Sequence, residues 1–122
     1  EENLLQNVRR LGGHLEATLS DRFGNHHHVG DIRGRGLFWA IELVKDRATK
    51  ETFDPKHKLH ARINDEMMAR GLILYPMGGT IDGVRGDHII LAPPYNVAEP
   101  LIDEIVGILG ESVDSAIRRL PA

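Results

Sequence analysis

The segment 37–44 constrains the fold most, because it is apolar on both of its faces. Successive side chains of an extended segment point to opposite faces, so a strand of this kind belongs inside a sheet. We therefore predict a central strand here. Gly34 and Gly36 precede this strand and predict a sharp turn or bulge that requires glycine. One predicted face carries Leu37, Trp39, Ile41 and Leu43, and the other carries Phe38, Ala40, Glu42 and Val44.

Three further segments have the periodicity of amphipathic helices. Residues 3–22 carry apolar side chains at spacings of three and four and end before Gly24. Asp54 and Pro55 form a favourable helix start, and the apolar spacing that follows continues to about residue 70. The third segment is 98–119. The positions expected to be buried are Leu4, Leu5, Val8, Leu11, Leu15 and Leu19 in the first helix, Leu59, Ile63 and Met67 in the second, and Leu101, Ile102, Ile105, Val106, Leu109, Val113 and Ile117 in the third.

Two short apolar segments, 72–75 and 88–92, are predicted strands, and a glycine-rich loop over 76–86 separates them. With the segment 29–36 as a strand before 37–44, the order of elements is helix, two strands, helix, two strands, helix, which predicts an α+β fold. We expect a small, mostly antiparallel sheet of three to four strands with the helices packed on it. The chain has 122 residues, a length that fits a single domain over 1–122.

Composition excludes several classes of function. The net charge of −3 argues against a dedicated nucleic-acid-binding protein, which usually carries a basic excess. No apolar run approaches the roughly 20 residues that span a bilayer, so we expect no membrane segment. The chain has no cysteine, which excludes a disulfide framework, a thiolate nucleophile and a cysteine zinc site. The lack of cysteine also fits a reducing compartment, and we expect a cytoplasmic protein.

Histidines are the first candidates for chemistry, since the chain contains the run 26–28 and the pair His57 and His60. Neighbouring residues of a strand point to opposite faces, so one metal ion rarely binds all members of such a run. His57 and His60 fall on one helix face, but a metal site needs further ligands that the sequence does not locate. Surface histidines are the favoured interpretation, and we expect no metal site.

The loop 76–86 is the second candidate, because a long loop inside a small domain is uncommon unless it is functional or mobile. Its one fixed positive charge is Arg85, which stands close to Asp82 and Asp87 in the sequence. An arginine in such a loop is suited to hold a carboxylate through two hydrogen bonds. The alternative is a surface arginine paired with its own aspartates, and the residues alone leave both interpretations open.

Four strings of residues, taken in order, resemble the C-terminal small domain of class III aminotransferases. These are pyridoxal-phosphate (PLP) enzymes of fold type I, and they include omega-amino-acid, ornithine and 4-aminobutyrate transaminases. The first string, 31–44 (DIRGRGLFWAIELV), is similar to the signature that opens that domain. The others are 65–73, 88–95 and 99–105, so the resemblance spans nearly the whole chain. The small-domain fold of that family agrees with the element order predicted above.

The resemblance implies transfer of an amino group between an amine or amino acid and a 2-oxo acid such as pyruvate. It also implies the cofactor PLP, bound by a lysine, an aspartate and phosphate-binding loops of a large domain. None of Lys45, Lys50, Lys56 and Lys58 resembles the cofactor lysine, so we expect no catalytic or cofactor-binding residue within 1–122. The implied partners are the large domain, a second identical subunit, and small amino and 2-oxo acid substrates.

In this family the small domain forms one wall of the substrate site and often supplies an arginine for the substrate carboxylate. In omega-amino-acid transaminases that arginine follows the Gly-Leu-Ile segment, where this chain has Tyr75. In ornithine transaminase it stands two residues before Ala-Pro-Pro, where this chain has Ile90. Arg85 is the nearest substitute, so we predict substrate binding by Arg85 and Tyr75. We expect Arg33 and Arg35 to bind local carboxylates or the large domain.

The chain begins without a methionine and has the length of one domain, so we expect a piece of a longer aminotransferase. Such a piece is predicted to be inactive alone, because the lysine that binds the cofactor lies elsewhere. It should also expose an apolar surface that meets the large domain. Two alternatives remain open at this point: an aminomutase or racemase of the same fold group, and a free-standing interaction module without catalysis.

Overall fold

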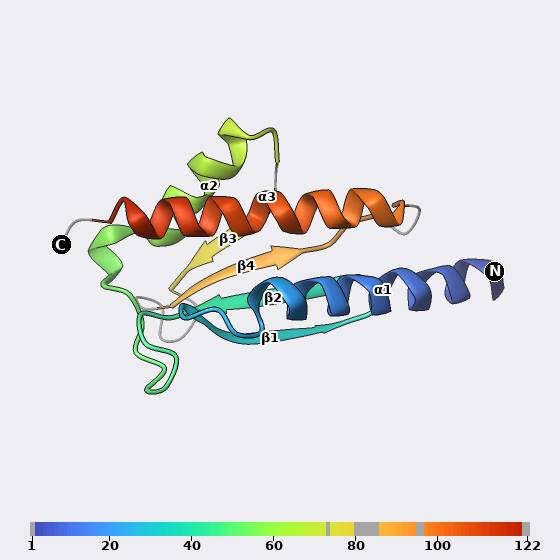
Figure 1. Cartoon of the computed structure of the whole chain (residues 1–122), viewed down its shortest axis with the longest axis horizontal. Coiled ribbons are helices and arrows are strands. Elements are labelled where there is room, and N and C mark those ends of the chain that lie inside the picture. The colour runs from blue at the N-terminus through green and yellow to red at the C-terminus, as the bar shows by residue number, and fades with distance from the viewer. Residues whose placement is uncertain (1, 73, 80–85, 95–96, 121–122) are drawn as a thin grey trace.

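The computed structural model describes residues 2–72, 74–79, 86–94 and 97–120. These residues form three α-helices, one turn of 3-10 helix and four strands (Figure 1). Within the described ranges, no helix is both long enough and apolar enough to cross a membrane. The elements are, in chain order, α1 (Glu2–Phe23), β1 (Val29–Arg35), β2 (Phe38–Leu43), η1 (Pro55–His57), α2 (Leu59–Ala69), β3 (Tyr75–Gly78), β4 (Asp87–Leu91) and α3 (Glu99–Arg118).

The four strands form one antiparallel sheet in the order β1-β2-β4-β3. Strands β1 and β2 pair as one hairpin, strands β3 and β4 pair as a second, and the pairing of β2 with β4 joins the two hairpins. Strand β2 therefore has a neighbour on each side, which confirms the central strand predicted for residues 37–44. The predicted α+β fold with a small antiparallel sheet is confirmed as well.

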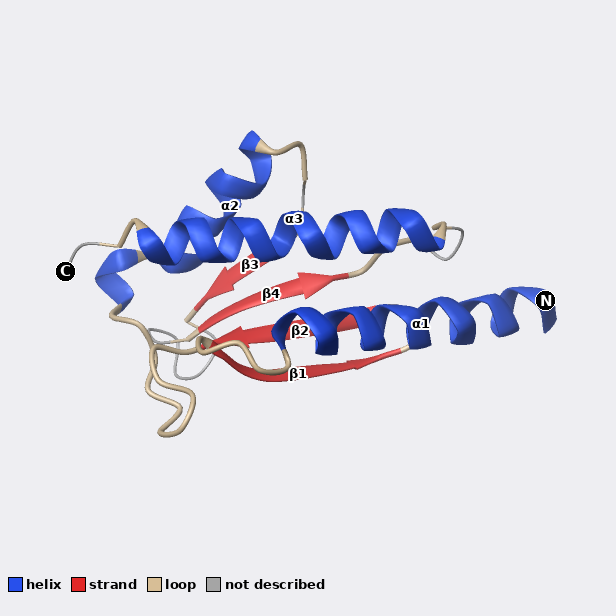
Figure 2. Ribbon diagram, viewed as in Figure 1, coloured by secondary structure: helices blue, strands red, loops and turns tan. Residues whose placement is uncertain are grey.

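The three helices cover one face of this sheet, so the molecule has two layers (Figure 2). Trp39, Ile41 and Leu43 of β2 and Ile89 and Leu91 of β4 are at most 7% exposed, and they belong to the core beneath the helices. Full burial of one such side chain stabilises a fold by about 1.5–3 kcal/mol. Helical periodicity correctly predicted most of the helix residues that share this core with the strands. These are Leu11, Leu15, Leu19, Leu59, Ile63, Met67, Ile102, Val106, Leu109 and Val113.

Helices α1 and α3 lie side by side and run in the same direction (Figure 1). A line of charged contacts joins them, and we call this line the helix seam. Gly110 of α3 makes room for the guanidinium of Arg22, since a Cβ atom at that position would clash with it. The contacts of the seam are Arg10 with Glu99, His14 Nε2 with Asp103 Oδ1 (2.7 Å), Arg22 Nη2 with Asp114 Oδ2 (2.6 Å) and His26 Nε2 with Asp114 Oδ1 (2.7 Å).

The turn between β1 and β2 lies directly against α1. A Cβ atom at Gly12 would lie 2.5 Å from the carbonyl oxygen of Gly36, so this point of the helix requires glycine. Gly36 itself has a φ of +57°, a conformation that glycine adopts without steric cost. Its carbonyl oxygen accepts a 2.7 Å hydrogen bond from Nε1 of Trp39. The predicted glycine-dependent turn is confirmed, and it fixes the position of α1 along the sheet.

The strand predicted over 72–75 is wrong in position, because the strand that forms is β3 at Tyr75–Gly78. Leu72 is buried and Leu74 is half-buried against the core beneath α3, so these leucines serve packing and not strand pairing. Pro76 is tolerated in β3 because this strand lies at the edge of the sheet. The predicted loop 76–86 is correspondingly shorter, and its residues 80–85 lie outside the described residues.

The helix predicted from Asp54 to about residue 70 is divided into η1 and α2. Asp54 caps η1 as expected, since its Oδ1 accepts a 3.0 Å hydrogen bond from the backbone N–H of Lys56. Lys58 then adopts a left-handed conformation with a φ of 48°, which separates the two elements. Asp87 of β4 caps the start of α2 from outside, because its Oδ1 accepts a 3.1 Å hydrogen bond from the backbone N–H of His60.

Candidate functional site

The face of the sheet opposite the helices carries the candidate site, and we call it the open face because no described helix covers it (Figure 2). Strand alternation and register assign residues of all four strands to this face. Two large apolar side chains are exposed there, Phe38 at 59% and Met77 at 44%. Met77 lies in the row of His88 and Glu42, and Phe38 lies four residues further along β2, so the two side chains mark separate parts of one uncovered face. The described side chains of the open face are Asp31, Arg33, Arg35, Phe38, Ala40, Glu42, Met77, His88 and Ile90.

The two positions that the resemblance assigns to alternative substrate arginines are direct neighbours in the sheet. Tyr75 of β3 pairs with Ile90 of β4. Residues paired across antiparallel strands have Cα atoms about 4.5–5.5 Å apart. The same row continues through Ala40 of β2 to Arg33 of β1. The two positions are far apart in the sequence but adjacent in the sheet, and neither of them holds an arginine in this chain.

The two residues predicted to bind substrate are not brought together by any contact that the structure describes. Arg85 lies outside the described residues. Tyr75 is placed by its backbone at the start of β3, and its side chain is outside the description as well. Substrate binding by Arg85 and Tyr75 therefore stays a prediction.

Four connected polar residues lie beside the row of Tyr75 and Ile90, and we call Asp31, Arg33, Glu42 and His88 the polar array. Nη2 of Arg33 lies 2.9 Å from Nε2 of His88, and Nε of Arg33 lies 3.3 Å from Oδ2 of Asp31. Nε2 of His88 also lies 3.4 Å from Oε2 of Glu42. A guanidinium can only donate, so we assign Nε2 of His88 as the acceptor and its imidazole as neutral.

Burial supports this assignment, because it lowers the pKa of His88 below the ordinary value for histidine. Glu42 acts in the opposite direction and the cation of Arg33 in the same direction as burial, so the net effect is a lowered pKa. A neutral His88 holds the guanidinium of Arg33 over the sheet. The contact of Arg33 with Asp31 confirms the prediction that this arginine binds a local carboxylate. Arg35 forms no ion pair with any residue that the structure describes.

The base of the β3–β4 hairpin is held from the helix side. Nδ1 of His60 lies 2.9 Å from Oδ1 of Asp87, whose side chain is 9% exposed. Gly78 pairs with Asp87, and a Cβ atom at Gly78 would clash with the imidazole of His60. The first turn of α2 therefore packs against both strands of this hairpin, on the opposite side of the sheet from the polar array.

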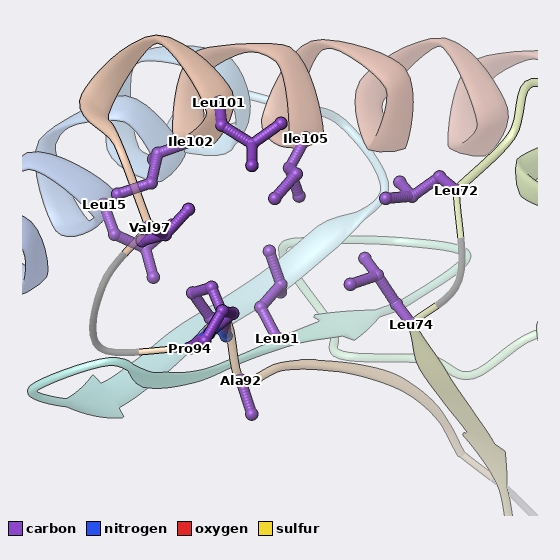
Figure 3. A pocket seen from close by; sticks show the side chains of 11 residues that line it. Leu15, Leu72, Leu74, Leu91, Ala92, Pro94, Val97, Leu101, Ile102 and Ile105 are labelled. Carbon is purple, nitrogen blue, oxygen red and sulfur yellow. The ribbon is translucent and has the colours of Figure 1, made fainter.

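An apolar cavity of about 180 Å³ lies at the end of the sheet where β4 finishes (Figure 3). Leu74 before β3 and Leu101 of α3 are among its lining residues. Leu101 is 46% exposed, and Leu4 and Leu5 of α1 are 43% and 55% exposed, so their predicted burial is wrong. The first turns of α1 project past the sheet, and no described element covers them (Figure 1). This apolar end is the second uncovered surface of the molecule.

The histidines of the run 26–28 have structural contacts. Nδ1 of His26 accepts a 3.0 Å hydrogen bond from the backbone N–H of His28, and its Nε2 contacts Asp114 in the helix seam. Nδ1 of His28 lies 3.1 Å from the carbonyl oxygen of Val44. Over the described ranges, no group of three or more His, Cys, Asp or Glu side chains is arranged to hold a metal ion.

Comparison with known proteins decides the family. A family model described as aminotransferase class-III matches residues 1–113. The chain belongs to the class III aminotransferase family. It is 44% identical over 120 residues to an uncharacterized aminotransferase of Schizosaccharomyces pombe, covering 98% of this chain and 26% of that protein. It is 39% identical over 122 residues to a taurine–pyruvate aminotransferase of Rhodobacter capsulatus, covering 100% of this chain and 25% of that protein.

Solved structures agree with this assignment. The chain matches an omega-aminotransferase from Paracoccus denitrificans with a TM-score of 0.85 and 34% sequence identity. The match covers 99% of this chain and 25% of the other. This class III aminotransferase chain therefore spans about a quarter of the length of the relatives it matches.

The class III family implies the cofactor PLP, but the residues of this chain do not fit a PLP site. The chain has four lysines, and all of them are exposed. Lys45 and Lys56 form ion pairs with neighbouring acids, and Lys50 donates a hydrogen bond to the carbonyl oxygen of Gly30. A lysine that forms a Schiff base is usually desolvated so that its amine loses its proton. These four exposed lysines lack that environment.

The sequence patterns did not predict Glu42 and His88 as residues of the candidate site. The one available signal was Glu42 itself, a lone charge on an otherwise apolar face of the predicted central strand. No pattern in the sequence around His88 indicates that it lies next to Glu42. Their contact depends on the register of β2 against β4, which pairs Glu42 with His88.

Proposed function

We propose that this chain is the small domain of a PLP-dependent class III aminotransferase, which transfers an amino group between an amine or amino acid and a 2-oxo acid. In this proposal the open face forms one wall of the substrate site. The observation that carries it is the pairing of Tyr75 with Ile90, which unites the two expected carboxylate-binding positions on an uncovered surface. The family match favours a catalytic parent over a free-standing interaction module.

Two uncovered surfaces support a larger partner domain in the same protein. The open face exposes Phe38 and Met77, and the apolar end exposes Leu4, Leu5 and Leu101. The matched relatives are much longer than this chain. We infer that the rest of the polypeptide covers both surfaces and supplies the lysine that binds PLP. A homodimeric, cytoplasmic enzyme is part of the same proposal, as the resemblance implies.

The proposed amino acceptor is a small 2-oxo acid, and pyruvate is the first choice because one matched relative is a taurine–pyruvate aminotransferase. The row of Tyr75 and Ile90 offers no guanidinium to the carboxylate of such a substrate. Arg85 is proposed to supply it, and Tyr75 to line the same pocket. A guanidinium binds a carboxylate through two parallel hydrogen bonds, which alanine cannot replace.

The role of Arg85 is tested in the longer enzyme with Arg85→Ala. Loss of a charge-assisted hydrogen bond of roughly 1.5–3 kcal/mol should raise KM for the 2-oxo acid by about tenfold or more. KM for an amine donor without a carboxylate should not change. Arg47→Ala, on the exposed loop after β2, is the matched control. Unchanged KM values for all carboxylate substrates would show that Arg85 does not bind them.

The proposed function itself is tested by expressing the longer protein that contains this chain. Supplied with PLP, an amine donor and pyruvate, it should form alanine, whereas residues 1–122 alone should form none. Residues 1–122 should also develop no absorbance band beyond that of free PLP when PLP is added. Activity or such a band from residues 1–122 alone would overturn the fragment assignment. A longer protein that isomerises a single substrate without an acceptor would instead be an aminomutase.

A further inference from the structure

The polar array carries more negative than positive charge. Asp31 and Glu42 are carboxylates, Arg33 is the guanidinium of the array, and His88 is neutral as assigned above. Arg35 is the other described cation on the open face, but it lies four residues from Asp31 along β1. Four residues of strand span roughly 13 Å, too far for a close pair. Counted over the residues that the structure describes, the array is therefore one positive charge short of neutrality.

Glu42 is the carboxylate of the array with the least solvent contact. Its side chain is 19% exposed, whereas that of Asp31 is 45% exposed and already pairs with Arg33. The contact that the structure describes for Glu42 is the 3.4 Å approach to Nε2 of a neutral imidazole. A neutral group does not supply a counter-charge, so the remaining water around Glu42 stabilises its ionised form.

Covering the open face would remove that water. A carboxylate that is taken out of water without a counter-ion strongly destabilises a protein. We propose that the rest of the polypeptide places a lysine or arginine side chain against Glu42 where it covers the open face. This inference rests on the proposed function, because it assumes that a larger domain of the same protein covers that face.

Three other sources of positive charge belong to this chain. Protonation of His88 would supply one, but Nε2 would then be a donor facing another donor, Nη2 of Arg33, at 2.9 Å. Arg85 is a second source within residues 1–122. Lys50 is a third, because its Nζ donates a hydrogen bond to the carbonyl oxygen of Gly30, and a Cβ atom at Gly30 would lie 3.1 Å from Oε1 of Glu42. All three sources predict that the partner of Glu42 is found inside this chain, so they can be separated from the proposal by substitution.

The decisive measurement is the thermal unfolding midpoint of the longer protein with Glu42→Gln, which keeps the side-chain shape and removes the charge. If a cation of the covering domain contacts Glu42, the variant leaves that cation buried alone, and the midpoint should fall by about 2 °C or more. A midpoint that is unchanged or higher would overturn the proposal. Glu51→Gln is the matched control, because Glu51 forms only an exposed 3.8 Å ion pair with Lys45.

The same substitution is then repeated in four backgrounds, Arg33→Gln, His88→Gln, Arg85→Gln and Lys50→Gln. Effects of residues in contact are not additive, so the size of the fall will differ in the Arg33→Gln and His88→Gln backgrounds, but Glu42→Gln should still lower the midpoint in all four. Loss of its effect in any background would assign the counter-charge to this chain and overturn the proposal. Alanine formation by the unsubstituted longer protein is measured separately. A failure of the proposed function and a failure of this inference would therefore be seen in different measurements.

Discussion

The helix seam and the polar array both join separate elements through charged side chains, but only the seam lies between two helices of this chain. In the seam, two arginines and two histidines meet three carboxylates between parallel helices. In the polar array, two carboxylates share one arginine and a neutral histidine on a face that no described helix covers. The difference separates contacts that complete this fold from contacts that require a further partner.

The largest expected effect concerns the glycine that positions α1, and with it the whole seam. Gly12→Ala should destabilise the chain by about 1–3 kcal/mol, because its methyl group meets the backbone of Gly36. Gly13→Ala should instead stabilise it by about 0.5–1 kcal/mol, because nothing lies within 4 Å of a Cβ atom there and alanine favours a helix. Urea unfolding of the two variants checks this, and effects of the same sign would contradict the close contact.

The next effect tests the seam at Asp114, whose carboxylate contacts both Arg22 and His26. Asp114→Ala should lower the free energy of unfolding by about 1 kcal/mol at neutral pH, since its partners are partly buried. Asp103→Ala should have a smaller effect, because the side chain of Asp103 is 56% exposed. Equal losses at both positions would show that burial does not set the strength of the seam contacts.

The dependence of stability on acidic pH gives a second test of Asp114. Burial alone would raise the pKa of Asp114, but hydrogen bonds from His26 and Arg22 outweigh it, and the pKa lies below the ordinary 3.8. The stabilisation is therefore complete above pH 3.8 and is lost as the pH falls through the lowered pKa. Asp114→Ala should lose less stability on acidification than the parent chain, as measured by unfolding at a series of pH values.

The polar array should respond to pH in a different range. Burial lowers the pKa of His88 below 6.5, so the unfolded chain takes up this proton more readily than the folded chain. The contribution of His88 to stability should therefore be complete above pH 6.5 and should be lost as the pH falls from 6.5 through the lowered pKa. His88→Gln should remove part of this decline, whereas the exposed His27→Gln should keep it. An unchanged pH profile in His88→Gln would contradict the assignment of a neutral, buried imidazole.

The smallest effect on stability is expected for the uncovered apolar side chain of the open face. Phe38 is 59% exposed, so Phe38→Ser should change the unfolding free energy of the chain by no more than about 0.5 kcal/mol. It should nevertheless reduce self-association of the chain, measured by sedimentation velocity. Arg10→Ala in the helix seam is the control and should leave association unchanged. A chain that stays monomeric at all concentrations would contradict an adhesive open face.

The sequence predicted an element correctly where its apolar pattern fits only one type of secondary structure. The apolar faces of segment 37–44 indicated a central strand, and helical spacing indicated most of the buried residues of α1, α2 and α3. Residues 72–75 were harder, because a short apolar segment suits a strand and a core-packed connection equally well. Leu72 and Leu74 pack into the core, and the strand begins at Tyr75 instead.

The candidate site was less predictable, because its residues come from different strands. The meeting of Tyr75 with Ile90 depends on the register of β3 against β4, and that of Glu42 with His88 on the register of β2 against β4. Neither register is encoded in a local pattern of residues. The exposure of Leu4, Leu5 and Leu101 follows from the projection of α1 past the sheet, which helical periodicity alone does not report.

The pairing of β2 with β4 also has a consequence for how the domain folds. Hairpin β1–β2 closes through a tight turn, whereas contact between Ile41 and Ile89 requires closure of a long loop that includes α2. Because the entropy lost on closing a loop grows with its length, the two hairpins should form before they join. The refolding rate of the chain should therefore be limited by the meeting of two preformed halves at the centre of the sheet.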